Sequence, residues 1–113
     1  RVPFAHAANG VVGLETLLPL SLELHQRDGM ALLDLLRLVT LAPADLLGLP
    51  QGRLAAGAPA DLLLFDLGLA WTVETAKFRS KSKNSPFDGR QVKGRALRTV
   101  VDGRTVFTLD DAA

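Results

Sequence analysis

The stretch GRLAAGAPADLLLFD, residues 52–66, divides the sequence into two parts of different character. Its first half is rich in glycine and alanine with one proline, a composition that indicates a loop. Its second half is an unbroken apolar run between Asp61 and Asp66. A short apolar run bounded by turn signals is typical of a strand buried on both faces, so we predict such a strand over residues 62–65.

Three helices are predicted on the N-terminal side of this stretch. In the first, leucines recur at helical spacing, Thr16 is a candidate N-cap, and Asp28-Gly29 is expected to end the segment. In the third, Pro43 is expected at the first helical position and Gly48 just after the last turn. The second helix carries its apolar stripe on Leu32, Leu35, Leu36 and Val39.

On the C-terminal side, ALRTVVDGRTVFTL (residues 96–109) contains two β-rich runs joined by Asp102-Gly103. Both turn residues tolerate positive φ, so this stretch predicts a hairpin. Residues 71–73 are expected to be less regular. The predicted strands are too few to cover both faces of the run at 62–65, so we expect further strands from a longer protein. A first residue of Arg1 rather than Met favours the same interpretation.

Composition excludes some classes of function. Thirteen Lys and Arg against twelve Asp and Glu give a net charge of +1, which argues against nucleic-acid binding. The basic stretch RSKSKNSPFDGR (residues 79–90) has no interleaved aromatic residues for stacking bases, so a structural role is expected there. Cysteine is absent, and no apolar run is long enough to span a bilayer. We expect a soluble, cytoplasmic protein without a membrane partner.

Four motifs in succession carry a family resemblance. GVVGLETLLPL (10–20), APADLLGL (42–49), GRLAAGAPADLLLFD (52–66) and SKSKNSPFDGRQVKG (80–94) resemble the C-terminal region of the type I dihydroorotases of the amidohydrolase superfamily. The resemblance implies an α+β fragment. Residues 1–50 would supply the last helices of an amidohydrolase (β/α)8 TIM barrel, and residues 51–113 the C-terminal strands of its accessory β-sandwich. Residues 79–94 would return to the barrel junction.

The same resemblance implies a zinc-dependent reaction in pyrimidine biosynthesis, the interconversion of N-carbamoyl-L-aspartate and L-dihydroorotate. The zinc ligands of the family precede the matched region, so no metal ligand and no catalytic residue is assigned here. The loop at residues 7–10 would lie over the active site and bind substrate through the main chain of Asn9 and Gly10. Asn9 stands where the family usually has an aromatic residue, and a simple turn before a helix explains Asn9-Gly10 equally well.

The other polar candidates favour structural roles. His6 is interpreted as a loop residue, and His25 as either a partner of a helix C-terminus or a half-buried packing residue. Glu15, Asp61 and Asp66 lie at the ends of predicted elements, where structure alone explains them.

Two further functions stay open for the longer protein: a non-catalytic dihydroorotase homologue that supports aspartate transcarbamoylase, and an allantoinase or hydantoinase. The expected partners are the N-terminal part of the same protein, a small-molecule substrate, and either a second copy of the protein or aspartate transcarbamoylase. Residues 1–113 alone are expected to be inactive.

Overall fold

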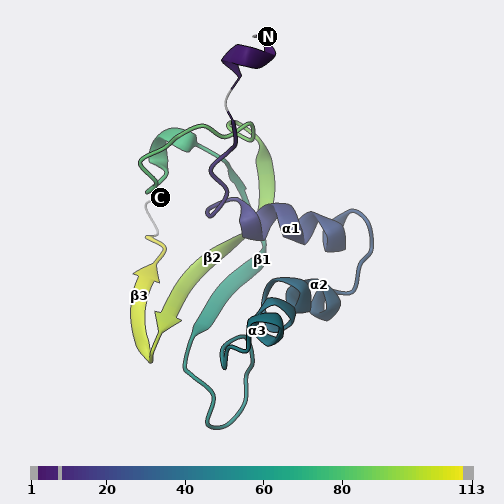
Figure 1. Cartoon of the computed structure of the whole chain (residues 1–113), viewed down its shortest axis with the longest axis vertical. Helices are drawn as coiled ribbons and strands as arrows, with labels where there is room; N and C mark the ends of the chain where they lie inside the picture. Colours follow the sequence, from purple (N-terminus) through teal and green to yellow (C-terminus); the bar gives the residue numbers. More distant parts are fainter. Residues whose placement is uncertain (1–2, 8, 111–113) are drawn as a thin grey trace.

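The structure, a computed structural model, describes residues 3–7 and 9–110. Three helices precede a three-stranded antiparallel sheet, and helix α1 crosses strands β1 and β2 (Figure 1). The elements in chain order are the 3-10 helix η1 (Phe4–His6), α1 (Leu17–Gln26), α2 (Leu32–Val39), α3 (Leu41–Leu47), β1 (Leu62–Thr72), the 3-10 helix η2 (Thr75–Lys77), β2 (Gln91–Val101) and β3 (Arg104–Thr108).

The predicted helices are present, with changes at their ends. Thr16 occupies the N-cap position of α1, but its buried hydroxyl donates to the Gly13 carbonyl oxygen at 3.3 Å and does not cap the helix. Helix α3 begins at Leu41, so Pro43 is its third residue and the prediction of a first position was wrong. Proline is tolerated there because the first-turn amides have no partner within the helix. Gly48 ends α3 in the left-handed conformation, as predicted.

The sheet has the order β1-β2-β3, with both pairs antiparallel. The Asp102-Gly103 hairpin is confirmed: the two residues have φ values of 51° and 75°. The turn is also tied to the start of β1. The Asp102 amide donates to Asp61 Oδ1 at 2.8 Å, and the Gly103 amide donates to the Ala60 carbonyl oxygen at 3.1 Å.

Strand β1 departs most from the prediction. It extends through Asp66 to Thr72, so residues 71 and 72 are regular strand. The strand continues because the pairing with β2 shifts register between Asp66 and Ala70, and Asp66 Oδ1 accepts the Gly68 amide at 2.9 Å within this irregularity. Leu62, Leu63 and Leu64 are 41%, 46% and 59% exposed, so burial on both faces was wrong for the chain as described. β1 is an edge strand of the sheet.

The core lies where α1 and the loops around it meet the sheet. Val73, Phe78 and Val92 are buried together, and Val12, Leu20, Trp71 and Phe87 pack against them. Many other large apolar side chains stay exposed, among them Phe4 (98%), Leu14 (93%), Leu54 (88%) and Leu46 (84%). Within the described residues, no helix is long and apolar enough to cross a membrane.

Helix α1 is attached to the sheet by three kinds of contact. Its fully buried Leu22 packs against Gly94 of β2, and an added Cβ at Gly94 would lie 2.3 Å from Leu22 Cδ1. Arg90 Nη2 lies 2.7 Å from both Glu23 carboxylate oxygens. Gln26 Nε2 donates to the Leu67 carbonyl oxygen at 3.2 Å. The helical and sheet parts of the chain therefore share one packed interface.

Candidate functional site

The segment before α1 lies against the loop after η2. Asn84 Nδ2 donates to the Gly10 carbonyl oxygen at 2.7 Å, and the Val12 amide donates to the Asn84 carbonyl oxygen at 3.1 Å. Closer to the helix, the Arg79 amide donates to Glu15 Oε2 at 3.0 Å. These bonds join parts of the chain that lie more than sixty residues apart, and they place the predicted substrate loop beside the basic stretch.

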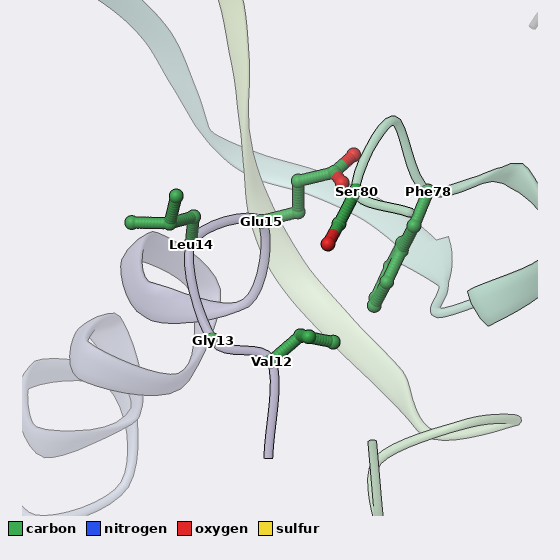
Figure 2. Close-up of a pocket in the computed structure, with 6 residues that line it drawn as sticks. All are labelled: Val12, Gly13, Leu14, Glu15, Phe78 and Ser80. Carbon is green, nitrogen blue, oxygen red and sulfur yellow. The ribbon is translucent and has the colours of Figure 1, made fainter. Parts of the chain in front are cut away.

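A small open cavity of about 130 Å³ lies between these two segments. In Figure 2 the Val12 side chain points toward the Phe78 ring, Leu14 points away from it, and Glu15 lies beside Ser80. The lining residues are Val12, Gly13, Leu14, Glu15, Phe78 and Ser80. The Glu15 carboxylate already accepts the Arg79 amide, so it holds the two segments together. The cavity itself contains no pair of groups suited to acid–base catalysis.

Asn9 and Gly10, the predicted substrate-binding residues, are both exposed and are not among the residues that line this cavity. Ala8, within the predicted loop 7–10, falls outside the described residues. Gly10 is not among the glycines with positive φ, and a Cβ added there would meet nothing within 4 Å. The fold of the chain therefore does not require glycine at position 10. A requirement for glycine there would have to come from a bound ligand.

The two histidines are placed apart, on different elements. His6 ends η1 and is exposed, whereas His25 lies in the last turn of α1 with Nδ1 2.8 Å from the Met30 carbonyl oxygen. His25 is half-buried and bonds a carbonyl just beyond its own helix, not one of the last carbonyls of α1. Among residues 3–7 and 9–110, no three His, Cys, Asp or Glu side chains gather in a group that could hold a metal ion.

The three carboxylates that were interpreted as structural all accept main-chain amides. Asp61 accepts the Asp102 amide, Asp66 accepts the Gly68 amide, and Glu15 accepts the Arg79 amide. Each bond links two loops or closes a turn. None of the three carboxylates is left as one of a reactive pair.

Most cations of the basic stretch contact the chain itself. The Arg79 guanidinium lies 5.0 Å from the centroid of the Phe107 ring, and Lys83 Nζ donates to the Phe78 carbonyl oxygen. Arg90 forms the ion pair with Glu23. Phe87 packs against the core, and Gly89, with φ of 81°, donates its amide to the Val73 carbonyl oxygen at 2.7 Å. These contacts support the structural role predicted for residues 79–90.

Sequence reasoning missed the two long-range contacts that organise this region. Residues 79–90 were expected only to have a structural role, and the bond from the Asn84 side chain to Gly10 was not foreseen. The Glu23–Arg90 ion pair was not foreseen either, because 67 residues separate the two side chains. The one available signal for Asn84 was its place in a motif that resembles the dihydroorotases.

Comparison with known proteins identifies the family. The sequence profile described as "Amidohydrolase family" matches residues 5–106. Over 105 residues the chain is 59% identical to the dihydroorotase of Anaplasma phagocytophilum, a match that covers 93% of this chain and 24% of the relative. The dihydroorotase of Geotalea daltonii is 47% identical over 109 residues, 96% of this chain and 26% of that protein. The chain thus spans about a quarter of the length of these curated relatives.

Solved structures of related enzymes share the fold. The L-hydantoinase (dihydropyrimidinase) of Arthrobacter aurescens superposes with a TM-score of 0.82 at 39% identity, covering 92% of this chain and 25% of that one. A D-hydantoinase structure gives the same TM-score at 23% identity over 89% of this chain and 22% of its own, which shows the shared fold alone. The chain therefore belongs to the amidohydrolase family.

Proposed function

We propose that the chain is the C-terminal part of a dihydroorotase, the enzyme that interconverts N-carbamoyl-L-aspartate and L-dihydroorotate. The observation that carries this proposal is the 59% identity to a dihydroorotase over 93% of the chain, against 39% to the L-hydantoinase structure. In this proposal residues 1–50 complete a (β/α)8 barrel and residues 51–113 belong to a β-sandwich. The exposed leucines of β1 support it, because a strand with uncovered apolar faces fits a larger sandwich.

Zinc belongs to this proposal through the family resemblance and not through these side chains. The described residues offer no metal-binding group, so they do not fit a zinc centre of their own. In the longer protein the metal would be held by residues outside this chain, and no catalytic step is assigned to residues 1–113.

The contribution proposed for this chain is substrate orientation by the main chain of Asn9 and Gly10. The exposure of both residues and the open space around Gly10 support it, because a ligand can approach the backbone there. A cyclic amide has its own donors and acceptors, which main-chain groups can match. Losing one such bond weakens binding by on the order of 1 kcal/mol, or several-fold in kcat/KM.

The experiment is a substrate comparison on the purified longer protein. Turnover of dihydroorotate, of a hydantoin and of allantoin is measured with the zinc content determined in parallel. We expect dihydroorotate to be preferred. A preference for the hydantoin or allantoin would identify a different cyclic-amide hydrolase, and a folded protein without turnover would indicate the non-catalytic homologue that supports aspartate transcarbamoylase.

The site is tested separately with Gly10→Val and Asn9→Ala. Because the fold leaves room for a side chain at position 10, Gly10→Val should leave thermal stability unchanged while lowering kcat/KM. Asn9→Ala should have the milder effect on kcat/KM. The opposite order would place the role on the asparagine side chain and would contradict main-chain binding.

A further inference from the structure

Asn84 contacts the segment before α1 at two points. Its side-chain amide nitrogen donates to the Gly10 carbonyl oxygen at 2.7 Å, and its main-chain carbonyl oxygen accepts the Val12 amide at 3.1 Å. One residue thus bonds to both ends of the tripeptide 10–12. Two bonds from one residue fix the orientation of the segment as well as its position, which a single bond would not do.

The orientation of the Asn84 side chain is itself determined by a neighbour. Ser82 Oγ donates to Asn84 Oδ1 at 2.6 Å. An amide group has one accepting oxygen and one donating nitrogen, so a donor on the oxygen side directs the nitrogen toward the Gly10 carbonyl. The motif residues 82–84 therefore act as a unit, in which Ser82 orients Asn84 and Asn84 holds residues 10–12.

These bonds also limit which main-chain groups can bind a ligand. The carbonyl of Gly10 and the amide of Val12 are already hydrogen-bonded to Asn84. Of the two predicted substrate-binding residues, this leaves the main chain of Asn9 and the amide of Gly10, which is a hydrogen-bond donor, for contacts with a ligand. A donor at this place suits a carbonyl oxygen of a cyclic amide.

We infer that Asn84 is a positioning residue for the substrate segment, oriented by Ser82, and that it presents the Gly10 amide to a substrate carbonyl. This inference rests on the proposed function for its substrate, but the conformational part stands on the contacts alone. Asn84 does not touch the substrate in this arrangement. It acts through the main chain of residues 10–12.

The conformational part is tested by hydrogen exchange on the longer protein, with Asn84→Ala and Asn84→Asp compared with wild type. The amides of peptides covering residues 9–15 should exchange about three- to tenfold faster in both variants, since each loses one hydrogen bond of ordinary strength. Peptides from α2 should be unchanged. Lys81→Ala, at an exposed neighbouring position, is the matched control and should exchange like wild type. Unchanged exchange at 9–15 in both Asn84 variants would overturn the inference.

The substrate part is tested by kinetics and by a rescue at Ser82. Asn84→Ala should raise KM for dihydroorotate about three- to tenfold with kcat within about twofold, because it removes binding common to ground and transition state. Ser82→Ala should show a smaller rise in KM, and Ser82→Thr, which keeps the hydroxyl, should restore the wild-type value. An unchanged KM alongside faster exchange would refute the substrate role. A wild-type protein inactive on dihydroorotate would refute the proposed function, while the exchange result would still decide whether Asn84 positions the segment.

Discussion

Replacing Gly94 by alanine should loosen the attachment of α1 to the sheet. Gly94 has φ of 101°, a region that costs a residue with a side chain on the order of 1 kcal/mol or more. The new methyl group would also meet Leu22 Cδ1 at 2.3 Å, and Leu22 has no exposed surface into which it could turn. Overpacking of this kind costs about 1–3 kcal/mol. Together the two effects predict a loss of about 3 kcal/mol in local stability.

Variants at two other glycines separate the backbone cost of a positive φ from the steric cost of the contact with Leu22. Gly29 has φ of 76° with open space around its Cβ position, so Gly29→Ala should cost only the backbone part, about 1 kcal/mol. Gly13 has neither a positive φ nor a close neighbour, so Gly13→Ala should be neutral or slightly stabilising. The three variants therefore form a series in which the steric contribution appears only at Gly94.

The assay is hydrogen exchange of α1 and β2 peptides in the longer protein. A loss of about 3 kcal/mol corresponds to exchange roughly a hundredfold faster in both peptides. A double variant with Leu22→Ala should recover part of the loss, because the new methyl group then occupies the space that Leu22 vacates. Equal effects of Gly94→Ala and Gly29→Ala, or strict additivity with Leu22→Ala, would refute the steric argument.

Three further predictions concern the ion pair, the hairpin and the isolated chain. Glu23→Gln should weaken the attachment of α1 by about 1 kcal/mol, measured by hydrogen exchange of α1 peptides. The Glu23 and Arg90 side chains are 20% and 39% exposed, so salt can screen the pair, and the difference from wild type should be smaller in about 1 M salt. Asp102→Val places a β-branched residue at φ of 51° and should cost about 1–2 kcal/mol in thermal unfolding, whereas Asp102→Asn should be tolerated; equal losses would contradict the turn argument. Residues 1–113 alone should associate in light scattering and bind no stoichiometric zinc, with a monodisperse complex formed on co-expression with the rest of the protein; a cooperatively folding monomer would contradict this.

The parts of the fold that were predictable are those with local signals. Gly48 ends a helix and Asp102-Gly103 forms a hairpin because the backbone conformation at these positions favours those residues whatever surrounds them. Strand β1 was underestimated because Asp66 and Gly68 are typical of strand ends. In the structure they lie in an irregularity where the Asp66 carboxylate satisfies the Gly68 amide, and the strand continues.

The candidate site was less accessible to sequence reasoning. The position of the 9–12 segment depends on Asn84, and hydrogen bonds between residues 74 positions apart leave no pattern in a single sequence. The need for glycine at position 94 is equally hidden, since it arises from Leu22 on a separate helix. Periodicity and turn chemistry report only on neighbours along the chain, so the joining of α1 to the sheet required the structure.

The bonds between the hairpin turn and residues 60–61 bear on the order in which the sheet assembles. β2 and β3 close across two residues, and hairpins of this kind form on a timescale of about 1–10 μs. β1 pairs with β2 only after the intervening segment 73–90 has been closed, which carries a larger entropic cost. The amides of Asp102 and Gly103 are in place once the turn has formed. They can then donate hydrogen bonds to the Asp61 carboxylate and the Ala60 carbonyl before the rest of β1 pairs with β2. We therefore expect β1 to join a preformed hairpin and to pair with it from this end.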